Sequence, residues 1–142
     1  MAVDSATGLR IVLADDSLLV RDGLARILRE RGVDIVAQAR SGVEAIAEVR
    51  RSRPDVVLLD VRMPPSYTNE GILAAEAIRR DVPSTGILVL SQDAERAHVE
   101  RLLGQTQRGI GYLLKDRVTN WSELADALVR VAGAAPRSIR WS

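Results

Sequence analysis

The chain has 142 residues, of which 46% are hydrophobic and 27% charged, and 20 basic against 19 acidic side chains give a net charge of +1. This length predicts a single domain with a sizeable core. The absence of cysteine excludes disulfides, thiolate zinc sites and cysteine nucleophiles, and the one histidine, His98, excludes a multi-histidine metal cluster. The nearly balanced charge argues against a dedicated nucleic-acid-binding face.

The sequence also bears on localisation. It contains no apolar run long enough to span a membrane, and the polar residues 1–8 lack the features of a signal peptide. We therefore expect a cytoplasmic protein without a membrane partner.

Five short apolar runs alternate with longer amphipathic stretches. Continuous apolar runs of this length are typical of strands that are covered on both faces, as in a parallel sheet. The expected strands are Leu9–Ala14, Val33–Ala37, Asp55–Leu59, Gly86–Leu90 and Gly109–Leu114.

The stretches between the strands predict helices. The first has apolar positions three and four apart, and the charged positions between them, Arg21 included, are assigned to its solvent-exposed face. Ser17 is its expected N-cap and Gly32 its expected end. Ser41 and Glu44 form a capping-box pattern that begins the second helix.

The later helices are expected over 70–80, over 94–103 and from Thr119 onward. Five strand–helix units predict an α/β domain, with a doubly wound five-stranded parallel sheet in the order 2-1-3-4-5. The domain is expected to cover residues 9–132, with 133–142 as a C-terminal tail or the start of a linker.

Polar side chains follow four of the five predicted strands. Asp15 and Asp16 come after the first strand, Asp60 after the third, Ser91 after the fourth and Lys115, the only lysine, after the fifth. Open α/β sheets bind ligands at the carboxyl ends of their strands, so we expect these groups to meet. Carboxylates about 4 Å apart repel by roughly 4 kcal/mol per pair, which favours a shared proton or a bound cation. An all-oxygen ligand set selects a hard ion such as Mg²⁺.

These groups also match a chemical task. A metal, a hydroxyl and an ammonium around a carboxylate are what is needed to hold a phosphoryl group in line with a nucleophile. Asp60, on the central strand, is the best candidate nucleophile, since carboxylates can form aspartyl phosphates. Ser91 and Lys115 would then contact phosphoryl oxygens.

These residues, in this order and at these intervals, and the pair Met63-Pro64, resemble the receiver domain of two-component response regulators, which has a flavodoxin-like (CheY-like) fold. The stretches ADDSLLVRDGLARIL and GYLLKD are most similar to the LuxR/NarL-type subgroup. The resemblance implies that Asp60 is phosphorylated by a sensor histidine kinase. It further implies that Ser91 and Tyr112 act as switch residues, and that Mg²⁺ is bound by Asp15, Asp16, Asp60 and the backbone carbonyl of Arg62.

The resemblance also implies partners and an output. A homodimer is expected through the fourth helix, the fifth strand and the fifth helix. The output is expected to be transcription, with DNA bound only by an output domain that this chain does not include. Such a domain catalyses its own phosphorylation and dephosphorylation and is a signalling phosphoacceptor rather than an enzyme.

The chain departs from the family pattern at a few positions. The loop Pro65–Glu70 is three residues longer than usual, Asp116 stands where a proline commonly follows the lysine, and Ser91 replaces the commoner threonine. A phosphorylation-independent, receiver-like interaction module is therefore the main alternative. A small-molecule phosphatase is a weaker one, because the haloacid-dehalogenase pattern needs an acid at Arg62.

Overall fold

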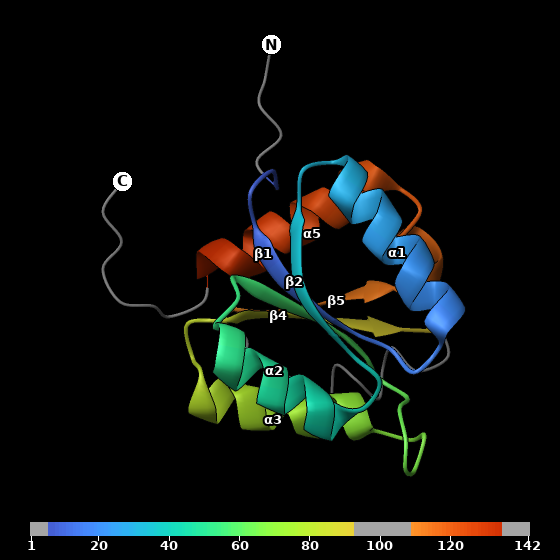
Figure 1. Cartoon of the computed structure of the whole chain (residues 1–142), viewed down its shortest axis with the longest axis vertical. Coiled ribbons are helices and arrows are strands. Elements are labelled where there is room, and N and C mark those ends of the chain that lie inside the picture. Colours follow the sequence, from blue (N-terminus) through green and yellow to red (C-terminus); the bar gives the residue numbers. More distant parts are fainter. Residues whose placement is uncertain (1–5, 93–108, 135–142) are drawn as a thin grey trace.

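The computed structural model describes residues 6–92 and 109–134 (Figure 1), so the helix expected over 94–103 lies outside the described residues. Strands and helices alternate along the chain as predicted. In chain order the elements are β1 (Arg10–Ala14), α1 (Leu18–Glu30), β2 (Asp34–Ala39), α2 (Gly42–Ser52), β3 (Val56–Asp60), α3 (Glu70–Asp81), β4 (Gly86–Ser91), β5 (Ile110–Leu114), the 3-10 turn η2 (Lys115–Arg117) and α5 (Trp121–Ala134).

The strands form one sheet in the order β2-β1-β3-β4-β5, and every neighbouring pair is parallel. The predicted fold class and strand order are confirmed. Helices α1 and α5 cover one face of the sheet, while α2 and α3 cover the other (Figure 1). All strands therefore present their carboxyl ends along one edge of the sheet.

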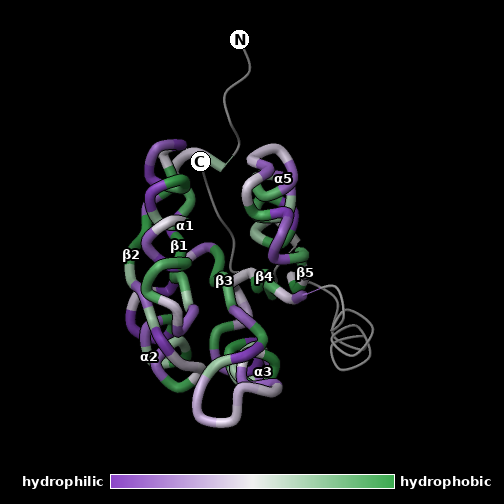
Figure 2. The backbone as a smooth tube through the Cα atoms, turned by 90° about the vertical axis from the view of Figure 1, so that its right-hand side faces the viewer, coloured by the Kyte–Doolittle hydropathy of each residue, from purple (hydrophilic) through white to green (hydrophobic). Residues whose placement is uncertain are grey.

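The core consists of two apolar layers separated by the sheet. On β3, Val56 and Leu58 pack into the layer under α1 and α5, whereas Val57 and Leu59 pack into the layer under α2 and α3. This alternation follows from the two-residue period of a strand. Every residue of β3 is buried, and the central strands are mostly hydrophobic in Figure 2. Asp60 thus stands at the end of a strand that apolar residues enclose on both faces.

The predicted helix ends are largely confirmed. The Ser17 hydroxyl accepts a hydrogen bond from the N–H of Val20 at the start of α1, and Gly32, with φ of +83°, follows the end of that helix. At the start of α2, the Ser41 hydroxyl accepts from the N–H of Glu44. The Glu44 carboxylate accepts from the N–H of Arg40 rather than from Ser41, so the reciprocal bond of the capping box is shifted by one residue.

Two expectations about helices were wrong. Arg21 is buried on α1 instead of solvent-exposed, because it lies three and seven residues before the buried Leu24 and Leu28 and shares their face. Asn120, not Thr119, caps α5, since its side-chain oxygen accepts from the N–H of Glu123. Helix α5 ends at Ala134.

A smaller difference concerns β2, which runs over 34–39 rather than 33–37.

Within the two described stretches, none of the helices combines the length and the hydropathy that a membrane span requires.

Candidate functional site

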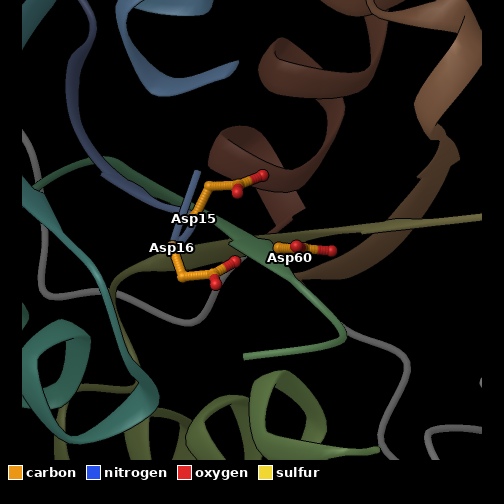
Figure 3. Close-up of side chains that lie close together, drawn as sticks. All are labelled: Asp15, Asp16 and Asp60. Carbon is orange, nitrogen blue, oxygen red and sulfur yellow. The ribbon is translucent and has the colours of Figure 1, made fainter. Parts of the chain in front are cut away.

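Three carboxylates meet at the carboxyl edge of the sheet (Figure 3). Asp15 and Asp16 directly follow β1, and Asp60 is the last residue of the neighbouring strand β3. One oxygen of each carboxylate lies within 4.8 Å of the others. Asp15 and Asp60 are buried, while Asp16 is more exposed. The structure therefore brings together the three acids that the sequence singled out.

The ammonium group of Lys115 lies beside two of these three carboxylates. Lys115 is the first residue after β5, and its Nζ lies 3.3 Å from Asp60 Oδ2 and 3.8 Å from Asp15 Oδ2. Its side chain is 31% exposed, so the ammonium borders solvent while facing two buried carboxylates. A cation here offsets part of the repulsion between the acids.

The surroundings of Asp60 favour its neutral form. Burial, and then the charge of Asp15, raise the pKa of Asp60 from its ordinary value of 3.8 to about 6. The ammonium of Lys115 and a hydrogen bond from the backbone N–H of Arg62 act in the opposite direction. The carboxylate is mostly charged at neutral pH, at a cost in stability that a bound cation would reduce.

Asp15 is held by several hydrogen bonds. Its N–H donates to the carbonyl of Ala39 at 3.0 Å, its carbonyl accepts from Arg21 Nη1 at 2.7 Å, and its Oδ1 accepts from the N–H of Ser17 at 2.9 Å. Its other carboxylate oxygen, Oδ2, is buried and has no hydrogen-bond partner among the described residues. An orphaned carboxylate oxygen beside two further acids fits a hard cation such as Mg²⁺.

Ser91 ends β4 at the same edge of the sheet. The register pairs Asp60 with Leu90 on one side and Ser91 with Leu114 on the other, so Ser91 lies between the ends of β3 and β5. Its side chain is fully buried, and its hydroxyl has no hydrogen-bond partner within the described part of the chain. A buried hydroxyl without a hydrogen bond costs about 1–3 kcal/mol, so binding of a group that accepts a hydrogen bond from Ser91 would be favourable here.

Two other predicted residues lie close to this edge. Tyr112 is on β5, partly buried, and packs against the apolar layer under α2 and α3. Arg62 follows β3 closely and contributes its backbone N–H to Asp60, whereas the sequence assigned a role to its carbonyl.

The loop between β3 and α3 protrudes from the body of the molecule (light green in Figure 1). Where it joins α3, the N–H of Gly71 donates to the carbonyl of Val61, and a Cβ at Gly71 would overlap the backbone carbonyl of Asp60. Within the loop, Tyr67 has a φ of +56°. Partial desolvation and the neighbouring Asp16 carboxylate raise the pKa of the Tyr67 phenol.

Arg21 and Tyr67 are site neighbours that the sequence did not reveal. The spacing of Arg21 from Leu24 and Leu28 was a usable signal, because it places the guanidinium on the buried face of α1. No comparable signal marks Tyr67, whose approach to Asp16 depends on the conformation of the longer loop.

Comparison with known proteins agrees with this geometry. The model of the response regulator receiver domain family matches residues 11–128. The transcriptional regulatory protein LnrK of Bacillus subtilis is 37% identical over 109 residues, which make up 76% of this chain and 47% of LnrK. A protein-glutamate methylesterase/protein-glutamine glutaminase of Haloarcula marismortui is 43% identical over 94 residues, 66% of this chain and 25% of that protein. The chain spans about half the length, or less, of these curated relatives.

Solved structures show the same relationship. The signal receiver domain of the response regulator NarL from Mycobacterium tuberculosis superimposes with a TM-score of 0.68 at 34% identity, covering 84% of this chain and 98% of that one. A LuxR family two-component response regulator from Aurantimonas sp. gives a TM-score of 0.73 at 28% identity, covering 92% of this chain and 89% of that one. Since the family model matches residues 11–128, which is most of the chain, and both solved structures are of response regulators, one of the LuxR family and one named NarL, the chain belongs to the response regulator receiver domain family, as the sequence predicted.

Proposed function

We propose that Asp60 accepts a phosphoryl group from the phosphohistidine of a sensor histidine kinase, and that this modification switches a protein surface that controls transcription. The observation that carries the proposal is the convergence at Asp60. Its Oδ2 lies 3.3 Å from the ammonium of Lys115, and its carboxylate lies beside those of Asp15 and Asp16.

The transfer follows from this arrangement. A carboxylate oxygen of Asp60 attacks phosphorus, a P–O bond forms, and the P–N bond to the donor imidazole breaks. Lys115 pairs with the phosphoryl oxygens that replace its present partner, Asp60 Oδ2. The Ser91 hydroxyl donates to another phosphoryl oxygen and thereby gains the partner that it lacks.

The same residues fit a resident Mg²⁺. Asp15, through its unpartnered Oδ2, and Asp16 and Asp60 would hold the ion together with the backbone carbonyl of Arg62. When bound, the ion supplies positive charge to the phosphoryl oxygens during transfer. Asp60 is deprotonated more completely once its repulsion by Asp15 is neutralised.

The switch is proposed at Ser91 and Tyr112. Movement of Ser91 toward a phosphoryl group would free space that the partly buried ring of Tyr112 can follow, changing the surface formed by β5 and α5. A homodimer through this surface and the helix expected over 94–103 is the proposed consequence. DNA would be bound by an output domain outside this chain. We further propose that the phosphoryl transfer from the kinase to Asp60 takes place in the cytoplasm.

The decisive experiment is phosphorylation by a small donor. Acetyl phosphate with Mg²⁺ should add the mass of one phosphoryl group to the wild-type protein and none to Asp60→Asn, while Asp22→Asn, an exposed acid on α1, behaves as wild type. An unmodified wild-type protein would contradict the proposal. Equal affinity of a partner protein for the wild type with and without the donor would instead favour the phosphorylation-independent interaction module.

A further inference from the structure

We infer that Arg21 is a positioning residue for the divalent cation, because it fixes the backbone carbonyl of Asp15 and thereby orients the carboxylate whose Oδ2 is left for the metal. The inference rests on the proposed function, in which Asp15 is a ligand of Mg²⁺. Arg21 itself touches neither the cation nor the phosphoryl group.

The geometry of the Arg21 side chain supports this role. The residue is only 8% exposed, and its guanidinium makes two hydrogen bonds in different directions. Nη1 donates to the backbone carbonyl of Asp15 at 2.7 Å, and Nε donates to the side-chain oxygen of Gln38 on β2 at 3.0 Å. A guanidinium is planar and rigid, so the two bonds tie the turn after β1 to the neighbouring strand.

The remaining polar groups of Asp15 are also restrained. Its N–H is bonded to Ala39, its carbonyl to Arg21 and its Oδ1 to the N–H of Ser17. Within residues 6–92 and 109–134, no hydrogen bond reaches Oδ2, which lies 3.8 Å from Lys115 Nζ within the site. The carbonyl that Arg21 holds is part of the planar peptide unit between Asp15 and Asp16. The hydrogen bond from Arg21 therefore also orients the backbone nitrogen of Asp16, the second proposed ligand.

The positive charge of Arg21 also supports the proposed positioning role. A guanidinium is costly to bury unless hydrogen bonds and opposite charge compensate it, and the hydrogen-bond partners of Arg21 are both neutral groups. The carbonyl that Arg21 holds belongs to Asp15, a member of the acidic cluster, so the guanidinium lies next to a residue that carries the opposite charge. A lysine could supply the charge, but it lacks the fork that reaches the Asp15 carbonyl and Gln38 together.

The test compares Mg²⁺ affinity between arginine variants by titration calorimetry. Arg21→Met should weaken Mg²⁺ binding by ~10–100-fold, the usual effect of removing a residue that orients a metal ligand. Arg21→Lys should recover part of that loss. Arg26→Met removes the same charge from an exposed position of the same helix and should change the affinity by less than about twofold, because solvent screens surface charges.

A second measurement requires no metal. Amide hydrogen exchange at Ser17, whose N–H is bonded to Asp15 Oδ1, should become faster in Arg21→Met and stay unchanged in Arg26→Met. If Arg21→Met does not fold, Arg21→Lys and Gln38→Met provide the same comparison. Both variants should then bind Mg²⁺ more weakly than the wild-type protein, and wild-type affinity in both would overturn the inference.

The possible results separate the two claims. An Arg21→Met protein with a lower melting temperature but wild-type Mg²⁺ affinity would overturn the inference and leave the proposed function standing, and equal weakening by Arg26→Met would overturn it as well. A wild-type protein that binds no Mg²⁺ would overturn the proposed function and this inference with it.

Discussion

The Nζ atom of Lys115 lies 3.3 Å from Oδ2 of Asp60, although the two residues are 55 positions apart in the chain. Every other basic side chain in the chain is an arginine. A guanidinium presents a rigid planar fork, whereas an ammonium is a compact charge with donors in three directions. The one lysine therefore stands where a compact cation suits both the carboxylate of Asp60 and the phosphorylated form proposed above.

Replacing Lys115 should slow phosphorylation of Asp60. Lys115→Met removes a charged hydrogen bond from the phosphoryl oxygens, and the acetyl phosphate reaction should be slower by ~10-fold or more. It also removes the two Lys115 effects that lower the pKa of Asp60, so that pKa should rise above about 6. Intact-mass time courses measure the rate. Lys115→Arg keeps the charge but not the geometry, and its full activity would show that charge alone suffices.

Asp60→Asn should stabilise the metal-free protein at neutral pH. The folded-state pKa of Asp60 is about 6 against an ordinary value of 3.8, so the folded state binds the proton more tightly than the unfolded state does. Wild-type stability should therefore fall as pH rises between these values, by roughly 3 kcal/mol in all. The amide has no charge to desolvate and should escape this loss.

Urea unfolding in the presence of a chelator measures the difference. Asp60→Asn should exceed the wild type in unfolding free energy at about pH 7.5 and approach it at about pH 4.5. A constant difference between the two proteins across this range would show that burial of the Asp60 charge is not responsible.

Ser91→Ala should affect the stability of the unmodified protein and its binding of a phosphoryl mimic in different ways. The hydroxyl of Ser91 has no hydrogen-bond partner among the described residues, so its removal should leave the unmodified protein as stable or more stable by ~1–3 kcal/mol. In the presence of Mg²⁺, Ser91→Ala should bind beryllofluoride, a mimic of the phosphoryl group, more weakly than the wild-type protein does.

Thr85→Val is the matched control for a buried hydroxyl. Thr85 is fully buried, and its Oγ1 donates to the carbonyl of Pro54 at 2.9 Å. Its replacement should lower the unfolding free energy by about 1–2 kcal/mol and leave beryllofluoride affinity unchanged. Similar stability losses in both variants would mean that Ser91 has a partner in the unmodified protein.

Gly71→Ala should displace the backbone at Asp60, the proposed phosphoacceptor. The added Cβ would overlap the Asp60 carbonyl, and overpacking of this kind costs ~1–3 kcal/mol. Gly23→Ala on α1 is the control, since nothing lies within 4 Å of a Cβ there and alanine should stabilise that helix by ~0.5–1 kcal/mol. Thermal unfolding distinguishes the two. Wild-type stability and phosphorylation in Gly71→Ala would show that the loop yields without moving Asp60.

The sequence predicted the sheet and the acidic cluster because both depend on strong, local signals. The run Val56–Leu59 is apolar without interruption, which is typical of a strand covered on both faces, and the polar residues after such strands meet where the strands are parallel. The N-cap of α5 was harder to predict from sequence. Thr119 and Asn120 both suit an N-cap, and only the hydrogen bond from Glu123 distinguishes them.

Arg21 shows a different reason for failure. Reading an arginine as a surface residue neglects that a buried backbone carbonyl, here that of Asp15, needs a donor. That need arises from the turn after β1, and it adds a reason for burial to the spacing of Arg21 from Leu24 and Leu28. The approach of Tyr67 to Asp16 was unpredictable, because it depends on a single positive φ in a loop of unusual length.

The complete burial of β3 has a mechanical consequence. This strand is bonded to a neighbour along each side and carries an apolar layer on each face, so it cannot slide or tilt without disrupting four contacts at once. Asp60 is therefore anchored at a nearly stationary point. When its charge or size changes, the rearrangement falls on the segments that surround it, and displacement is directed outward from the middle of the molecule to its periphery.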